Sequence, residues 1–97
     1  MTYSPWTYWP IYVNHIPTMR NDLCTIARFV LKKQRTLLKI SQEDLADRCQ
    51  LDRTYISGFE RGVRNISLNS LDKIIHGLGL TYEDFFNLCL QDFEENK

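Results

Sequence analysis

Apolar residues recur at three- and four-residue steps in several segments of this chain, with polar residues between them. This spacing places the apolar side chains on one face of an α-helix. The clearest case is the segment 21–37, whose apolar positions are Leu23, Ile26, Ala27, Val30 and Leu37. Similar segments follow, and together they predict an all-α fold, a bundle of five helices.

Two short helices joined by a tight turn are predicted at the centre of the chain, over residues 41–62. Ser41 and Asp52 can cap helix N-termini with their side-chain oxygens, and Gly62 readily takes the left-handed conformation that ends a helix. Asp44 stands three residues after Ser41, where a capping box normally has Glu or Gln. We therefore expect that box to be imperfect.

The second of these helices, predicted over residues 53–61, carries polar side chains able to form hydrogen bonds. Ala46 is a small residue where the two helices would cross, as in a helix-turn-helix. In that motif the N-terminal end of the second helix enters the major groove of DNA. The polar residues at and after this end are Arg53, Thr54, Tyr55 and Ser57. The pattern favours a sequence-specific DNA-binding protein; the alternative is a helical bundle whose second helix is a solvated polar face.

Two further helices complete the predicted bundle. Ser67 would cap the fourth helix, which ends at Gly77 and Gly79, and Thr81 would cap the fifth. The fifth helix is more apolar than one buried face requires, so we predict a twofold dimer through it, and fraying of the acidic tail after Asp92. The alternative is that all its aromatic residues lie in the core. The predicted dimer contacts are Leu80, Phe85, Phe86, Leu88 and Cys89.

Charge is unevenly distributed although the chain has no net charge. Residues 20–65 hold ten basic and six acidic side chains, a balance of +4, whereas residues 66–97 hold two and six, a balance of −4. The basic half contains the predicted motif. A basic region around a reading helix is expected of a DNA-binding protein.

Several classes of function find no support in the sequence. No apolar run is long enough to span a membrane, and the first residues do not form a secretory signal. The cysteines are three, without zinc-ligand spacing, so we expect free buried thiols in a cytoplasmic protein. No catalytic constellation, metal site or cofactor site is predicted.

The first 18 residues differ from the rest in composition. They contain both tryptophans and all three prolines, and they carry no Lys, Arg, Asp or Glu. Proline disrupts a regular helix, so we predict an extended aromatic arm at 1–18 that covers apolar surface on its own domain or on a dimer partner. The helix-turn-helix domain with its C-terminal dimerisation helix is then predicted over 19–97.

The segments SQEDLA, LDRTYISGFERGVRN and SLNSLDKIIHGLGL resemble a known family. Residues 30–80 are similar to phage-repressor-type helix-turn-helix domains, and more narrowly to controller proteins of restriction–modification systems. The resemblance implies a dimer that binds operator DNA upstream of its own gene. Such controllers activate their own gene and the endonuclease gene and repress both as protein accumulates. The alternatives are a phage-type repressor, an antitoxin, or a protein-interaction module that keeps the fold.

The resemblance also implies roles for individual residues. Arg53 corresponds to an arginine that reads guanine, and Gln42 to a glutamine that holds a phosphate. Arg35 and Glu60 correspond to an internal ion pair. The full predicted DNA-binding set is Gln42, Arg53, Thr54, Tyr55, Ser57, Arg61, Arg64 and Asn65.

Two further points follow from the resemblance. The carboxylates Glu43, Asp44 and Asp47 stand where such repressors can touch the polymerase sigma subunit, although stabilisation of the helix dipole explains them equally well. Lys39 stands where the wider family often has Gly. A left-handed backbone at Lys39 would carry roughly 1 kcal/mol of strain.

Overall fold

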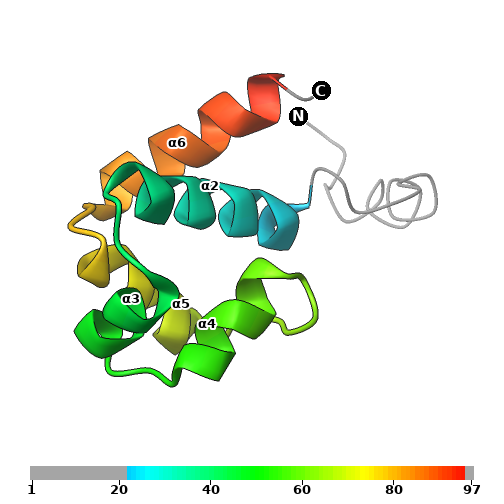
Figure 1. Cartoon of the computed structure of the whole chain (residues 1–97). Coiled ribbons are helices and arrows are strands. Elements are labelled where there is room, and N and C mark those ends of the chain that lie inside the picture. Colours follow the sequence, from blue (N-terminus) through cyan, green and yellow to red (C-terminus); the bar gives the residue numbers. More distant parts are fainter. Residues whose placement is uncertain (1–21, 96–97) are drawn as a thin grey trace, which may run out of the picture.

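The computed structural model describes residues 22–95, which form five α-helices and no strand (Figure 1). The predicted all-α, five-helix fold is confirmed. The aromatic arm predicted at 1–18, and its boundary with the domain at residue 19, lie outside the described residues. The helices, labelled as in Figure 1, are α2 (Leu23–Leu37), α3 (Gln42–Cys49), α4 (Arg53–Glu60), α5 (Leu68–Gly77) and α6 (Tyr82–Glu95).

Each helix begins where a side-chain oxygen accepts a hydrogen bond from the backbone of its first turn, which satisfies an otherwise unpaired N–H group. At Ser41 the capping box closes in both directions: the Asp44 N–H donates to Ser41 Oγ (2.9 Å), and the Ser41 N–H donates to Asp44 Oδ2 (3.4 Å). The box expected to be imperfect therefore forms with Asp in place of Glu. The capping residues are Asp22, Ser41, Asp52, Ser67 and Thr81.

The helices pack in two layers. Helix α6 lies along α2 on one side, and α3, α4 and α5 lie on the other side of α2 (Figure 1). One apolar cluster joins the layers, and partly buried Ile40, Leu51, Ile66, Leu71, Leu80 and Leu88 border it. The buried cluster consists of Ile26, Ala27, Val30, Leu31, Leu45, Ala46, Cys49, Ile56, Phe59, Ile74, Ile75, Leu78, Phe85 and Cys89.

Some residues expected in the core are exposed instead. Leu23 lies in the first turn of α2 and Leu37 in its last turn, and both side chains are exposed. Periodicity places them on the correct face, but a terminal turn can extend past the helix that covers the rest of that face. Helix α6 continues to Glu95, so the expected fraying does not begin directly after Asp92.

Two non-glycine residues adopt the left-handed backbone conformation, Lys39 (φ 62°) and Gln50 (φ 57°). Lys39 lies within the connection from α2 to α3, and it adopts the strained left-handed conformation that the family resemblance led us to consider. Gln50 ends α3, where its N–H bonds back to the last turn. The chain therefore reverses direction before and after α3 at positions that Gly would occupy more easily.

The fifth-helix residues predicted to contact a second protomer divide into two groups. Phe85 (0% exposed) and Cys89 (6% exposed) are buried in the protomer's own core, so the prediction of a dimer contact is wrong for these two. Leu80 and Leu88 are partly buried against the same core. Phe86 remains available, at 53% exposed. The cause is α2, which covers the opposite face of α6 from Phe86.

Candidate nucleic-acid interface

Helices α3 and α4 form the predicted helix-turn-helix. Ala46 is buried where the two helices pack, and the Leu51 N–H donates to the Ala46 carbonyl oxygen (2.9 Å) across the turn. Asp52 then caps α4, with Oδ1 accepting from the Thr54 N–H (3.0 Å). These local bonds set the direction of α4 relative to α3.

Helix α4 is anchored on one side and exposed on the other. Ile56 and Phe59 are each 1% exposed and attach the helix to the core. Arg53 and Thr54, in its first turn, are both exposed. The structure thus presents the guanidinium and hydroxyl groups at the helix end that reads DNA in this motif.

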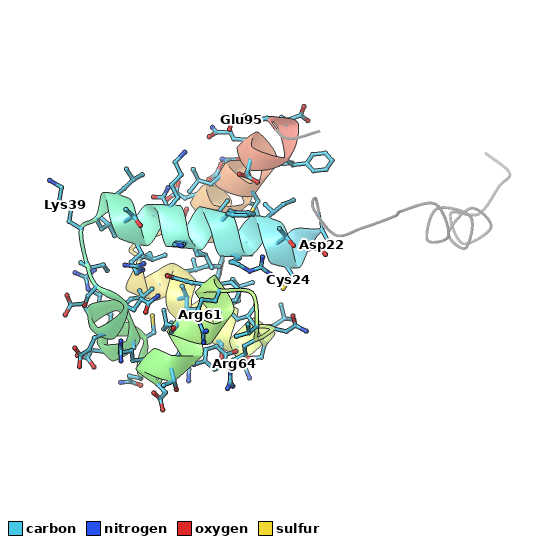
Figure 2. The ribbon with its side chains drawn as sticks, turned by 45° about the vertical axis from the view of Figure 1, so that its right-hand side comes forward. Asp22, Cys24, Lys39, Arg61, Arg64 and Glu95 are labelled. Atoms are coloured by element: carbon cyan, nitrogen blue, oxygen red, sulfur yellow. The ribbon has the colours of Figure 1, made fainter. Side chains whose placement is uncertain are left out.

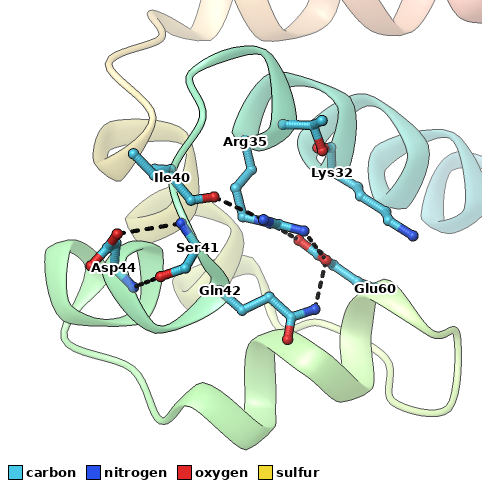
Figure 3. A network of polar contacts seen from close by, with 8 residues as sticks. Lys32, Arg35, Ile40, Ser41, Gln42, Asp44 and Glu60 are labelled. Carbon is cyan, nitrogen blue, oxygen red and sulfur yellow. Dashed lines mark hydrogen bonds and ion pairs between the residues drawn. The ribbon is translucent and has the colours of Figure 1, made fainter.

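A polar network joins the C-terminal end of α4 to α2 and α3 (Figure 3). Arg35 of α2 donates from Nε to Glu60 Oε2 (2.7 Å) and from Nη2 to Glu60 Oε1 (2.9 Å). Its third nitrogen, Nη1, donates to the Ile40 carbonyl oxygen (2.8 Å). The bidentate bond to Glu60 raises the pKa of Arg35. The predicted Arg35–Glu60 ion pair is present and joins α2 to the end of α4.

Gln42 belongs to the same network. Its amide nitrogen Nε2 donates to Glu60 Oε1 (2.8 Å), as Figure 3 shows. The first residue of α3 is therefore held against the last residue of α4. A phosphate at Gln42, as predicted, would meet a side chain that is already oriented.

The remaining predicted DNA contacts lie at and after the C-terminal end of α4. Arg61, Arg64 and Asn65 are all exposed. Arg64 lies beside α4, on the side of the molecule that is opposite α6 (Figure 2). Three exposed guanidinium groups therefore lie on α4 and in the loop after it, those of Arg53, Arg61 and Arg64.

Tyr55 and Ser57 are half-buried, unlike Arg53 and Thr54. The Tyr55 hydroxyl oxygen accepts a hydrogen bond from the Ser67 N–H (3.2 Å), which ties α4 to the start of α5. The Arg64 guanidinium lies over the Tyr55 ring, 5.2 Å from its centroid. Part of the Tyr55 side chain is thus engaged within the protein.

Sequence reasoning missed two α2 residues that contact the loop after α4. The Cys24 thiol donates to Asn65 Oδ1 (Sγ–O 3.7 Å). Cys24 is half-buried, so the prediction of a buried thiol is wrong for this residue. The Arg28 guanidinium packs on Gly62, and its buried Nε has no hydrogen-bond partner. Cys24 and Arg28 are four residues apart on one helix face, the only signal that could have linked them.

Residues 22–95 do not meet the requirements of a metal site or of a membrane-spanning helix. Residues 22–95 contain no group of three or more His, Cys, Asp or Glu side chains placed to hold a metal ion. None of the helices described here is both long and apolar enough to cross a bilayer. The carboxylates of Glu43, Asp44 and Asp47 are exposed on α3, and Asp44 serves the capping box.

Two short helices at a tight turn, with the second anchored by its apolar side and exposing its N-terminal end, define a helix-turn-helix DNA-binding protein. The profile of the helix-turn-helix family matches residues 31–85, more than half of the chain. That family consists of DNA-binding regulators and is not an enzyme family.

More specific relatives are control proteins. The chain is 47% identical over 57 residues to control protein C.MunI of a Mycoplasma species, covering 59% of this chain and 74% of that protein. It is 50% identical over 48 residues to control protein C.BamHI of Bacillus amyloliquefaciens, covering 50% of this chain and 59% of that protein.

Solved structures agree with the sequence relatives. The wild-type restriction–modification controller protein C.Esp1396I matches with a TM-score of 0.73 and 41% identity, covering 75% of this chain and 96% of that one. Its tetramer in complex with its natural 35 base-pair operator matches with a TM-score of 0.72 and the same identity and coverage. The chain therefore belongs to the helix-turn-helix family, and within it to the controller proteins of restriction–modification systems.

Proposed function

We propose that this protein is a cytoplasmic transcriptional regulator that binds operator DNA as a homodimer and controls its own gene and a restriction endonuclease gene. One observation carries the proposal. Arg53 and Thr54 are exposed at the start of α4, while Ile56 and Phe59 hold the same helix in the core. The membership in the controller family and the operator complex of C.Esp1396I support it.

Arg53 is proposed as the main base-reading residue. Its planar guanidinium can donate two parallel hydrogen bonds to O6 and N7 of a guanine in the major groove. The hydroxyl groups of Thr54 and Ser57 can bond to neighbouring base edges or phosphates. A short helix can read bases only if its orientation is fixed. The Arg35–Glu60 pair joins the end of α4 to α2 and so opposes tilting of α4.

The other members of the predicted set would hold the DNA backbone beside α4. Gln42, at the start of α3, lies against the last residue of α4, and Arg61, Arg64 and Asn65 follow that residue in the chain. Phosphate contacts fix register and orientation and make binding dependent on salt. Tyr55 lies between these groups on α4.

The proposed dimer uses the exposed side of α6. Phe86 (53% exposed), Leu90 (59%) and Phe93 (37%) recur at four- and three-residue steps and form an apolar stripe that the described residues leave uncovered. A twofold dimer through this stripe would read two half-sites about one helical turn, ~10 base pairs, apart.

Contact with the polymerase sigma subunit is part of the proposal for activation. Glu43 and Asp47 are exposed on α3, the helix that lies beside the reading helix. Reversing the charge of Asp47 should reduce transcription activation in a reconstituted assay and leave operator affinity unchanged. Activation that persists after the reversal would exclude the sigma contact at Asp47.

Operator binding is tested by a mobility shift with the DNA upstream of the protein's own gene. The wild type should form a complex that survives random competitor DNA and weakens as salt rises. Arg53→Ala should cost about 1–3 kcal/mol of specific binding and relax discrimination at one base pair. Lys73→Ala is the matched control, because Lys73 is an exposed cation on α5.

The opposite results are equally clear. An Arg53→Ala loss of the same size on operator and random DNA would exclude the base-reading role. Wild-type binding that random DNA abolishes would leave only a basic surface. No binding to either DNA would favour a protein-interaction module that keeps the fold.

A further inference from the structure

The Arg64 side chain is folded back along the reading helix. Arg64 belongs to the loop that follows α4, yet its guanidinium lies 5.2 Å from the centroid of the Tyr55 ring, in the first turn and a half of that helix. The Arg64 side chain therefore contacts α4 along its length, from its Cβ atom at Gly58 to its guanidinium at Tyr55.

Gly58 provides the space for this path. A Cβ atom at position 58 would lie 3.3 Å from Arg64 Cβ and 3.5 Å from Arg64 Nε, so the Arg64 side chain crosses directly over the glycine. Gly58 is buried beneath it. Because Tyr55 and Gly58 are three residues apart, they lie on the same side of α4. The Arg64 side chain therefore packs first on Gly58 and then on the ring of Tyr55, along one side of α4.

Tyr55 is itself fixed in place. Its hydroxyl oxygen accepts from the Ser67 N–H at 3.2 Å, so the ring cannot swing away from the helix without breaking this bond. Its face is electron-rich and attracts a guanidinium. Arg64 thus lies on a held aromatic surface.

The charge of Arg64 affects the pKa of Asp52, the capping residue at the N-terminal end of α4. The pKa of Asp52, the capping residue, is lowered mainly by the hydrogen bond from the Thr54 backbone, and the Arg64 charge contributes to the same shift. The guanidinium therefore lies within electrostatic reach of the residues beside Arg53.

We propose that Tyr55 and Gly58 are positioning residues that hold Arg64 against α4, so that Arg64 binds DNA as part of the same surface as Arg53. This inference rests on the proposed function. Tyr55 acts through Arg64 and the loop, and its own contact with DNA is secondary.

A double-mutant cycle tests this role, with mobility shifts on the upstream DNA and urea unfolding of each variant. Tyr55→Leu should weaken operator binding about three- to tenfold, part of the loss expected for removing an arginine contact. Tyr55→Phe keeps the ring face that the guanidinium binds but removes the hydroxyl that accepts from the Ser67 N–H, so its loss of affinity should be smaller than that of Tyr55→Leu. In the Arg64→Ala background, Tyr55→Leu should cause no further loss. A full Tyr55→Leu loss in that background would show direct contact with DNA and overturn the proposal.

Gly58→Ala separates positioning from stability. Ala is a better helix former than Gly, so the urea midpoint should stay equal or rise. The added Cβ displaces the Arg64 stem, and operator affinity should fall. Weaker binding with unreduced stability supports the role; unchanged binding overturns it.

The controls distinguish this inference from the proposed function. If Arg53→Ala weakens operator binding but Arg64→Ala does not, the positioning role is overturned and the function stands. If the wild type does not prefer the upstream DNA to random DNA, the proposed function fails, and the positioning role fails with it.

Discussion

Glu60 is the residue on which the arrangement of α2, α3 and α4 depends most directly. Its carboxylate is almost completely buried and accepts from both Arg35 and Gln42. A buried ion pair need not stabilise more than an apolar pair would, but removing one partner leaves a buried charge unpaired.

We expect Glu60→Ala to destabilise the fold by about 1–3 kcal/mol, because the partly buried Arg35 guanidinium and the Gln42 amide would both lose their acceptor. Urea unfolding followed by circular dichroism measures the change. Glu83→Ala, at an exposed position of α6, is the control and should have little effect. A loss at position 60 no larger than at position 83 would contradict the role of the pair.

The three thiols should differ in reactivity. Burial raises the pKa of Cys89 to about 11, with a further contribution from Asp92, and burial also raises the pKa of Cys49. Both thiols therefore form little thiolate near neutral pH, and neither is accessible. Cys24 is half-buried and lies against Asn65.

Alkylation at pH 8 followed by mass spectrometry should modify Cys24 first, and Cys24→Ser should remove this fast phase.

Because the folded pKa of Cys89 exceeds its ordinary value of about 9, the folded protein binds the thiol proton more tightly than the unfolded chain does. Its contribution to stability is complete below that value and declines as pH rises from about 9 to about 11. Stability that rises over this interval would contradict the assignment.

At the scale of the element, caps and left-handed residues define where helices begin and end. The five N-caps use the side chains of Asp, Ser and Thr, which the sequence shows directly. The connections before and after α3 are different, because Lys39 and Gln50 take a left-handed backbone conformation that is strained for a residue with a Cβ atom.

Lys39→Gly should therefore stabilise the protein. Relief of the strained backbone is worth roughly 1 kcal/mol, reduced by the greater freedom of Gly in the unfolded chain. Thermal or urea unfolding measures it. Gly79→Ala is the complementary variant: at φ 76° an added Cβ meets no neighbour but strains the backbone, so stability should fall. Destabilisation by Lys39→Gly would show that the lysine side chain contributes more than the strain costs.

At the scale of the whole molecule, the reading surface and the apolar stripe lie on different helices. The residues proposed to contact DNA belong to α3, α4 and the loop after α4, whereas Phe86, Leu90 and Phe93 belong to α6. Helix α2 lies between α6 on one side and α3 and α4 on the other (Figure 1). A dimer through α6 would leave both reading helices uncovered.

Phe86→Glu should shift the protein toward a monomer in sedimentation at micromolar concentration, because it places a charge in the apolar stripe. Operator affinity should fall with it, since two half-sites no longer bind together. Asn87→Glu, at an exposed neighbouring position, is the control. A wild type that sediments as a monomer at this concentration would exclude the proposed dimer.

The sequence by itself determined the elements and their ends. Periodic apolar residues, capping side chains and the family resemblance predicted five helices, the helix-turn-helix and the Arg35–Glu60 pair, and the structure contains all of them. These features are local, or correspond residue by residue to known relatives. Periodicity identifies which side of a helix is apolar without information from the rest of the chain.

The tertiary structure decided which side chains are covered and which meet. Phe85 and Phe86 are adjacent and equally apolar, but only Phe85 lies in the core. Arg64 on Tyr55, Cys24 on Asn65 and Gln42 on Glu60 could not be foreseen, because each contact joins separate segments. Such contacts depend on the angles at which helices pack, and the identity of one residue does not specify those angles.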